Sequence, residues 1–541
     1  MAPITPEPRN VWLPRLLAAI LIVGAAVARI VYLGWFSALD LAPDEAHYWD
    51  WSRHLDWSYY SKGPLVALLI RGSCELFGSL SIAWTGSEML AVRLPAVLCG
   101  ALLATGLYVL IVQTWKRETL ALGGVILAMT FPMLAAGSSL ITIDAPLTCL
   151  WTWALVTGFE AAVRQKAWAW PVTGLLIALG ILAKPTMVLW LPCFGLFLLA
   201  TPAARPLLWR REFWIMSATA FLGAIPLIYW NSQNDWVTWK HTGGHAGMNA
   251  RQFLYPLGPL NYLGTQIALL LVYWFVVWAA GLWRYRPWMA TTRLEERYLW
   301  WMSAPIFIFF GIFSLKNGGG EPNWPIVCYL AGMVLAVGWI QEKLTSPFPW
   351  PRRLTIFGIS SVACVGILAT VVLHFPIHAQ PLYAALAGPK SPDRPMPIRR
   401  LDPTARMRGW QTLASAVETA RADVRKTGVE PILAGMNWTL PGEISFYLPD
   451  HPNIYALGPA QGERQSQYDL WRPNPLADPD HFRGKTFVMI NADPPILAQM
   501  FDTVERRDIV EYREGDYLMC YWSVAICHGF RGCPVIVKKT H

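Results

Sequence analysis

Hydrophobic residues fall along this chain in blocks of about 20, separated by short polar stretches. A helix of that length crosses a bilayer core of roughly 30 Å. The first block is too long for a signal peptide, and no small-residue cleavage site is followed by a plainly soluble chain, so we expect the block to be a span. The pattern predicts an all-α polytopic membrane protein with about eleven spans, near residues 12–36, 91–113, 119–136, 146–163, 168–183, 187–202, 213–230, 262–283, 298–315, 324–341 and 354–374.

Positive charge marks every second short loop. After Arg9 and Arg15 the basic positions are Lys116-Arg117, Arg164 with Lys166, Arg205 with Arg210-Arg211, Arg284 with Arg286, Arg293 and Arg297, and Lys343 with Arg352-Arg353. Basic loops favour the cytoplasm. We therefore expect a cytoplasmic N-terminus and, with an odd number of spans, a periplasmic segment 376–541. Orientation and attraction to anionic lipid heads account for the net charge of +9, so no nucleic-acid partner is expected.

The composition changes after Pro376. Residues 376–407 are rich in Pro and Arg and indicate a linker between a transmembrane domain, 1–375, and a C-terminal domain, 408–541. An amphipathic helix is expected at 408–427. Short β-prone runs follow at 431–435, 453–457, 485–490 and 517–524, so the periplasmic domain is predicted to be α/β.

The nine cysteines do not indicate a metal site. Those in apolar spans are expected to be small core residues. Cys520, Cys527 and Cys533 lie in the external domain, where oxidation is possible, and we expect a bridge between Cys527 and Cys533.

Charged residues gather on the predicted outer face of the membrane. The long first external loop, about 37–90, carries Asp44-Glu45 near its start and Lys62 before a helix expected to lie on the membrane surface. Asp144 opens a later helix, where an N-cap is the alternative role. Lys184 and Arg29 lie near the outer ends of spans, where snorkelling is the alternative. Acids that activate a hydroxyl and cations that hold a phosphate suit glycosyl transfer from a lipid phosphate.

At these residues the chain resembles the glycosyltransferases of GT-C fold that use polyprenyl-phosphate sugars. These are the protein O-mannosyltransferase-like enzymes and, in particular, bacterial members related to the lipid A aminoarabinose transferase. The resemblance covers nearly the whole chain, with motifs at Asp44-Glu45 with Tyr48, Ser61-Lys62-Gly63-Pro64-Leu65, Arg93-Leu94-Pro95, Asp144-Ala145-Pro146, Leu182-Ala183-Lys184, Glu321-Pro322-Asn323-Trp324-Pro325, Gly409-Trp410, Phe446-Tyr447-Leu448-Pro449 and Gln467-Tyr468-Asp469-Leu470-Trp471. Ser61 and Gly63 depart from the motif, in which a glutamate and a proline are common, and this weakens the case for a metal site and for aminoarabinose as the sugar.

The resemblance implies an inverting transfer with Asp44 as general base and Glu45 as the residue that orients it or pairs with a lysine. Lys62, with Lys184 or Arg29, would hold the donor phosphate. Acceptor or sugar contacts are assigned to Asp144, Tyr48, Tyr60, Lys316 and Glu321. Asp144 has two alternatives, a pair with a cation or the helix cap.

No cofactor is required, because these cations supply the positive charge that a departing phosphate needs. A metal pair at His241 and His245 is the weaker alternative, since Gly243-Gly244 argues against a helix there. The loop at Gly318–Gly320 either closes over the sugar or is a plain connector.

The expected partners are the bilayer, a polyprenyl-phosphate-linked sugar, and an acceptor that is a glycolipid such as lipid A, a polysaccharide or a protein. The location is the inner membrane of a bacterium, with the active site periplasmic. Two other classes stay open: a lipid-linked-sugar transporter or flippase, and a ligase that uses a lipid diphosphate.

Overall fold

The computed structural model describes residues 11–245, 254–391 and 394–534. The chain forms two compact units. The first contains Met1–Leu33, Asp56–Val66 and Arg93–Thr370, and the second contains Gly34–Leu55, Ala67–Val92 and Val371–His541. Parts of the first external loop therefore belong to the same unit as the C-terminal domain.

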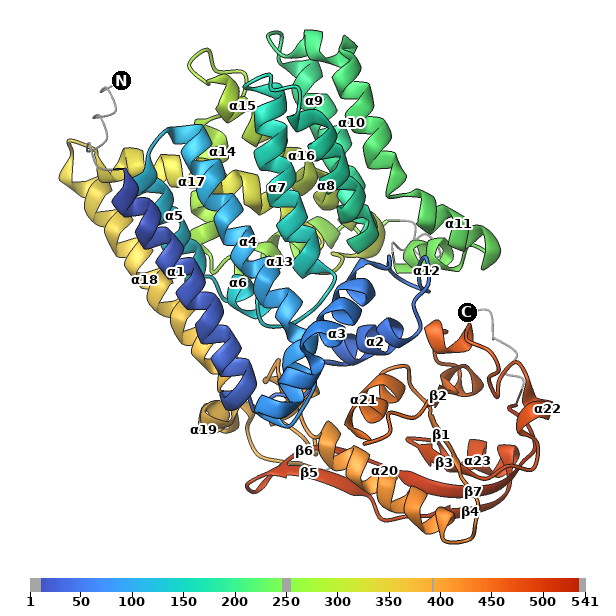
Figure 1. Cartoon of the computed structure of the whole chain (residues 1–541). Helices are drawn as coiled ribbons and strands as arrows, with labels where there is room; N and C mark the ends of the chain where they lie inside the picture. The colour runs from blue at the N-terminus through green and yellow to red at the C-terminus, as the bar shows by residue number, and fades with distance from the viewer. Residues whose placement is uncertain (1–10, 246–253, 392–393, 535–541) are drawn as a thin grey trace. The chain divides into compact units, whose positions relative to one another are not determined.

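The first unit is helical (Figure 1). Its helices are α1 (Trp12–Val31), α4 (Met89–Trp115), α5 (Glu118–Met129), α6 (Pro132–Gly137), α7 (Asp144–Ala162), α8 (Ala169–Ala183), α9 (Trp190–Ala200), α10 (Arg211–Leu222), α11 (Ile225–Gln233), α12 (Val237–His245), α13 (Gly258–Leu269), α14 (Tyr273–Arg284), α15 (Leu294–Trp301), α16 (Ala304–Asn317), α17 (Ile326–Leu344) and α18 (Pro349–His374). Helix α7 packs against α8, and α8 packs against α10. Large aromatic residues fill the centre, with Trp151, Trp170 and Trp190 almost completely buried.

Seven helices among the described residues are long and apolar enough to cross a membrane, or eight if the bent pair α13 and α14 forms one span. The predicted count of eleven is not confirmed, because helices at 118–129, 169–183 and 185–200 are shorter than a full span. The block at 262–283 is broken, with an angle of 109° between α13 and α14. In contrast, α3 (Leu65–Thr85), predicted to be a surface helix, is itself apolar enough to span.

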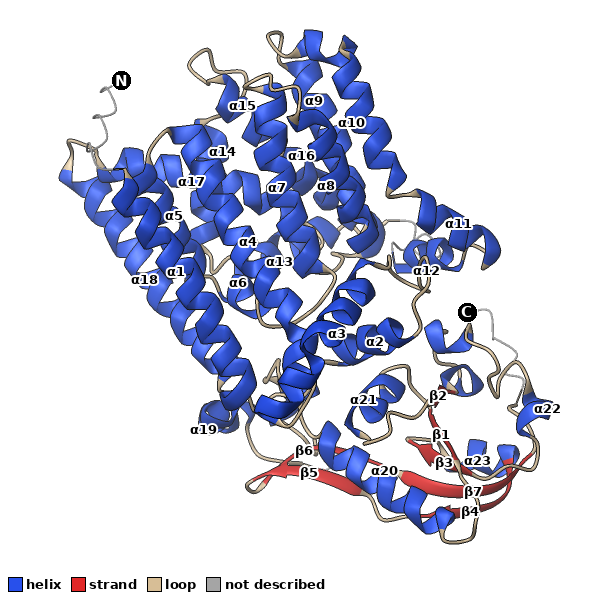
Figure 2. Ribbon diagram, in the orientation of Figure 1, coloured by secondary structure: helices blue, strands red, loops and turns tan. Residues whose placement is uncertain are grey.

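The second unit contains all the strands of the described chain (Figure 2). Its other helices are α2 (Pro43–Arg53), α19 (Pro376–Ala387), α20 (Trp410–Arg425), α21 (Leu440–Tyr447), α22 (Pro479–Phe482) and α23 (Pro494–Met500). The strands are β1 (Ile432–Gly435), β2 (Tyr455–Ala456), β3 (Phe487–Ile490), β4 (Phe501–Arg506), β5 (Val510–Glu514), β6 (Tyr517–Trp522) and β7 (Val524–Phe530). The helix and the short strands expected from the sequence are present, and β4, β5 and β7 are additional. The predicted linker contains a helix, α19.

The main sheet has the strand order β2-β1-β3-β7-β4. Strands β1, β2 and β3 are parallel, whereas β7 runs antiparallel to β3 and β4. Alternate residues of β3 enter different cores: Val488 and Ile490 pack with α20, and Phe487 and Met489 pack on the opposite face. Two covered faces explain why the strand is apolar at every position.

The predicted bridge between Cys527 and Cys533 is wrong, because both cysteines are free. Cys527 lies inside β7 opposite Phe487 and is buried in the core. Cys533 lies beyond the strand, with its Sγ 4.0 Å from the carbonyl oxygen of Pro475. Pairing within the sheet thus keeps the Cys527 thiol in the core.

Candidate active site

The acidic motif of the first loop forms the N-terminus of α2. Glu45 is completely buried, and its Oε2 accepts a hydrogen bond from the backbone N–H of Ala42 at 2.9 Å. This is the carboxylate half of a capping box, which fixes the start of the helix. Glu45 therefore holds in place the turn of backbone that carries Asp44.

The Asp44 side chain remains accessible, with 43% of its surface exposed, and its Oδ2 lies 3.3 Å from Nη2 of Arg406. At this exposure a substrate hydroxyl can reach the carboxylate. Asp44 is thus available as a base, and Arg406 is a neighbour that the sequence did not reveal.

The rest of α2 packs into the C-terminal domain. The backbone of Gly442 in α21 lies directly against the carbonyl of Ala46. Tyr48 is buried beside His47 and Trp51, which gives it a packing role. Burial, with the nearby charge of Arg464, lowers the pKa of His47 to about 3, so this imidazole is neutral at physiological pH.

Lys62 lies in a tight turn before α3. The N–H of Tyr59 donates to the carbonyl oxygen of Lys62 at 3.0 Å, and the Lys62 side chain is half-buried. The next residue, Gly63, lies so close to the carbonyl of Leu182 that a Cβ at this position would overlap it. The turn that carries Lys62 is therefore packed against the end of α8, two residues before Lys184.

Three contacts within the first unit fix the residues that precede this turn. The indole Nε1 of Trp230 donates to Asp56 Oδ2 at 2.6 Å. The hydroxyl of Thr238 donates to the carbonyl oxygen of Tyr59 at 3.1 Å. The ring of Tyr60 lies 4.9 Å from that of His241. The loop is thus attached to α11 and α12.

Helix α12 corrects one expectation, because it includes both Gly243 and Gly244. The side chain of His245 lies outside the described residues. Among the residues that are described, no group of three His, Cys, Asp or Glu side chains could hold a metal ion.

Asp144, Lys184 and Asn323 form a polar cluster. Lys184 Nζ lies 2.7 Å from Asp144 Oδ1, and Asn323 Nδ2 donates to Asp144 Oδ2 at 2.6 Å. The N-cap residue of α7 is Ile143, which makes no side-chain capping bond, and the N–H of Asp144 donates to Thr142 Oγ1 at 3.3 Å. Of the alternatives for Asp144, the pair with a cation is the one that the structure contains. Lys184 is 94% buried by this arrangement, since only 6% of its surface is exposed.

The late loop contributes Asn323, although Lys316 and Glu321 were the residues predicted from the sequence. Lys316 lies in the last turn of α16 and Glu321 is exposed. Gly318, Gly319 and Gly320 all have positive φ, which lets the chain reverse direction before Asn323. The motif itself contained Asn323, and only the fold shows that this amide reaches Asp144. Arg29 lies half-buried in the last turn of α1, and its role stays a prediction.

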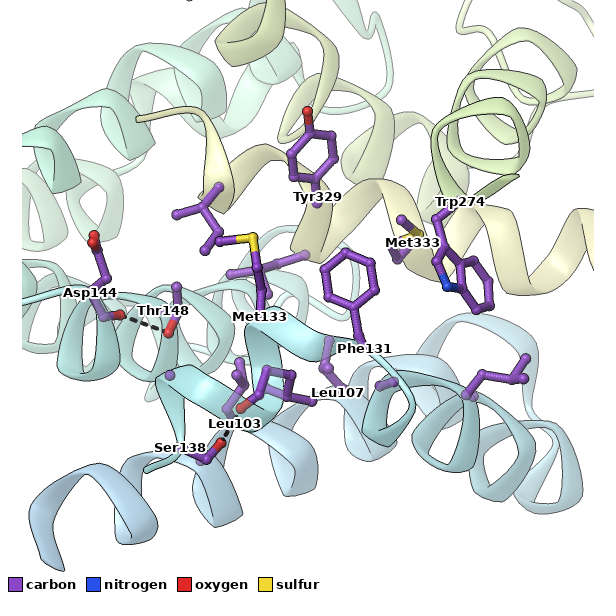
Figure 3. A pocket seen from close by; sticks show the side chains of 18 of the residues that line it. Leu103, Leu107, Phe131, Met133, Ser138, Asp144, Thr148, Trp274, Tyr329 and Met333 are labelled. Atoms are coloured by element: carbon purple, nitrogen blue, oxygen red, sulfur yellow. Dashed lines mark hydrogen bonds between the residues drawn. The ribbon is translucent and has the colours of Figure 1, made fainter. Parts of the chain in front are cut away.

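An apolar pocket among the helices is lined at one end by Asp144 of this cluster, and its empty volume, open solvent included, is about 1100 Å³. Figure 3 shows Asp144 and Thr148 at one end and Trp274 and Met333 at the other. Between them lie Leu103, Leu107, Phe131, Met133 and Tyr329. The pocket suits a long hydrocarbon group whose polar end meets a charged cluster.

A multi-spanning helical unit with an appended α/β domain and an acidic first loop defines a GT-C glycosyltransferase. The ArnT structures from Cupriavidus metallidurans share this fold. At 18% identity and with 94% of this chain and 97% of ArnT covered, the TM-scores are 0.59 for the apo state and 0.60 for the state bound to undecaprenyl phosphate.

A family model described as dolichyl-phosphate-mannose-protein mannosyltransferase matches residues 61–230. The lipid A galacturonosyltransferase RgtD of Rhizobium johnstonii is 30% identical over 366 residues, which cover 66% of this chain and 71% of RgtD. The chain belongs to this family of membrane glycosyltransferases. It is a multi-pass protein of the bacterial inner membrane and a glycosyltransferase that depends on a polyprenyl-phosphate sugar.

Proposed function

We propose that the chain transfers a sugar from a polyprenyl phosphate to a hydroxyl or phosphate of lipid A at the periplasmic face. The observation that carries the proposal is the apolar pocket that ends at the charged pair of Asp144 and Lys184. An isoprenoid chain needs an apolar enclosure, and the phosphate at its end needs nearby cations. The relatives support the substrates: ArnT binds undecaprenyl phosphate, and RgtD acts on lipid A.

The proposed reaction is a single displacement. A hydroxyl of the acceptor loses its proton to Asp44 while its oxygen attacks the anomeric carbon. The bond from that carbon to the phosphate oxygen breaks, and polyprenyl phosphate leaves with the electron pair. Lys62 is proposed to stabilise the negative charge on the leaving phosphate. Inversion at the anomeric carbon follows from attack opposite the leaving group.

Lys184 has a more specific role in this proposal. Its ammonium already pairs with Asp144, so it supplies less net charge to a phosphate than Lys62 does. The pair, with Asn323, instead gives the pocket a rigid polar end. Asp144 and Asn323 are oriented by these bonds and are the groups proposed to contact the donor sugar.

The activity test uses the purified full-length protein in detergent with undecaprenyl phosphate galacturonate and lipid A. We expect lipid A to gain the mass of one galacturonyl residue, as seen by mass spectrometry. Undecaprenyl diphosphate galacturonate is the matched donor control. Product formed only from the diphosphate would identify a ligase, and movement of the donor across liposomes without product would identify a transporter.

The orientation is tested separately. Single cysteines introduced at 113–118, 203–212 and within the C-terminal domain are treated with an impermeant thiol reagent in intact cells with a permeable outer membrane. The proposed topology predicts labelling of the C-terminal domain alone. Labelling of the two loops alone would place the C-terminal domain in the cytoplasm and reject the proposed side of reaction.

A further inference from the structure

The C-terminal domain contains a second cavity that shares no residue with the candidate active site. Its empty volume is about 1330 Å³, and it lies where the chain leaves β3 for α23. Its other walls come from the ends of β4 and β6. Open α/β sheets usually bind ligands beyond the carboxyl ends of parallel strands, and β3 is such a strand.

Positive charge dominates the walls. Three arginines, Arg399, Arg506 and Arg507, line the cavity with a single carboxylate, Asp493. Arg507 is balanced, because its Nη2 lies 3.1 Å from Asp423 Oδ2 and 3.3 Å from Glu505 Oε1. The charges that remain for a ligand are therefore those of Arg399 and Arg506.

The side chains of these two arginines can both bind a ligand, but they differ in the contacts that they already make. Arg506 is exposed and makes no side-chain hydrogen bond or ion pair with the residues that the structure describes. Arg399 Nη1 donates to the carbonyl oxygen of Met519 at 3.0 Å, which fixes the guanidinium without neutralising it. A guanidinium fixed by a carbonyl oxygen and an exposed one without an ion pair among the described residues together suit an anion with several oxygen atoms.

Apolar surface lies beside the arginines. Ile509 is 55% exposed and Tyr521 is 48% exposed, although both line the same cavity. The ring of Tyr521 offers a flat apolar face and a hydroxyl. The polar backbone turn at Asn491 is held by hydrogen bonds to Ser523 in both directions, at 2.9 and 3.1 Å. A ring with a C–H face and an anionic group would meet complementary chemistry here.

We propose that this cavity binds an anionic saccharide, phosphorylated or uronic, and so holds part of the glycolipid acceptor outside the active site. Arg399 and Arg506 bind the anionic group, and Tyr521 packs on the sugar ring. The assignment of the saccharide to the acceptor rests on the proposed function, whereas the binding itself does not.

The test measures binding of soluble saccharides to the full-length protein in detergent by calorimetry. The probes are a bis-phosphorylated glucosamine disaccharide, a galacturonic acid disaccharide and, as the neutral control, chitobiose. We expect the anionic probes to bind and chitobiose to bind at least tenfold more weakly. The tighter of the two anionic probes identifies whether phosphate or carboxylate is preferred.

The variants are Arg506→Ala, Arg506→Lys and the control Arg483→Ala. Among the described residues the Arg506 side chain makes no hydrogen bond or ion pair, so its replacement should leave the fold intact. We expect Arg506→Ala to raise the Kd by about tenfold, the loss typical of one charge-assisted hydrogen bond, and Arg506→Lys to recover part of it. Arg483 is another exposed arginine of the same domain, it pairs with Asp480, and its removal should not change saccharide binding.

Equal binding of all three probes, or equal loss in Arg506→Ala and Arg483→Ala, would reject the cavity as a saccharide site. A transfer assay distinguishes failure of the saccharide site from failure of the proposed function. Arg506→Ala should raise the KM for lipid A and leave kcat and donor hydrolysis without acceptor unchanged. If the protein binds the saccharides normally but has no transferase activity, the proposed function is rejected and the saccharide site is still supported.

Discussion

The backbone of Gly63 lies against the carbonyl group of Leu182, with no room for a Cβ between them. This contact joins the turn that carries Lys62 to the end of α8, beside Lys184. The family motif often has a proline at this position, and the glycine of this chain lets the loop approach the helix closely. The departure from the motif is therefore accommodated by packing.

Gly63→Ala should displace the Lys62 turn, because the added methyl group meets a backbone carbonyl that belongs to a helix. We expect a clear rise in the KM for the polyprenyl-phosphate donor and a lower kcat, measured by transfer to lipid A. Gly72→Ala is the matched control, since a Cβ at that glycine of α3 meets nothing within 4 Å. Equal donor KM values in both variants would contradict the packing argument.

Lys62→Ala should weaken donor binding and slow transfer together, because the positive charge acts on the bound phosphate and on the departing one. Lys62→Arg should retain part of the activity, since the charge survives while its geometry changes. Donor affinity is measured by calorimetry and turnover by mass spectrometry. Full activity and unchanged affinity in both variants would move the phosphate role to Lys184 or Arg29.

Asp44→Asn should reduce turnover by about 10²–10⁴, the usual contribution of a general base. The amide is nearly isosteric and can still accept a hydrogen bond from Arg406, so the protein should remain folded. Glu75→Gln is the control, because Glu75 is an exposed carboxylate of α3 that pairs with Arg71. Near-normal turnover in the purified Asp44→Asn protein would exclude Asp44 as the base.

Asp144→Ala should destabilise the first unit by about 3–5 kcal/mol, because it leaves the Lys184 ammonium buried and unpaired. The double variant Asp144→Ala with Lys184→Met removes both charges and should recover much of that loss. Unfolding in detergent, followed by tryptophan fluorescence, measures both. Additive losses in the double variant would show that the pair in the structure contributes no coupling.

The buried carboxyl group of Asp469 should make the stability of the C-terminal domain depend on pH. Burial raises the pKa of this carboxyl to about 6, despite its hydrogen bonds from Ser466. The unfolded value is about 3.9, so the folded state retains the proton more strongly between about pH 4 and 6. The contribution of Asp469 to stability is present at the acidic end of this window and is lost as the pH rises through it.

Thermal unfolding measured at several pH values tests whether this contribution to stability falls as the pH rises. The Tm of the wild-type protein should fall from pH 4 to pH 6 relative to that of Asp469→Asn, which cannot ionise. Asp480→Asn, at a highly exposed carboxyl, serves as control and should follow the wild type. Parallel Tm profiles for the wild type and Asp469→Asn would show that burial does not shift this group.

The sequence determined the class of protein, because hydrophobic block length and charge alternation are properties of consecutive residues. Spans such as 12–36 and 354–374, the helix near 408–427 and the strand at 485–490 follow from such local patterns. The order of the motifs along the chain can also be read from the sequence, and it indicated the glycosyltransferase family. Strands β4, β5 and β7 were missed, β4 and β5 because charged residues such as Asp502 and Glu505 interrupt their apolar pattern.

Only the tertiary structure decided which of the motif residues meet. Asp144, Lys184 and Asn323 lie on three separate segments, and nothing in the sequence separates Asn323 from its neighbours Lys316 and Glu321 as the partner of Asp144. Likewise, the burial of Glu45 as a helix cap depends on the packing of α2 against α21. The hydrophobic pattern indicates which segments are apolar enough to enter a membrane or a core. Ion pairs and close backbone contacts depend on which loops the packed helices bring together, and that is a property of the whole fold.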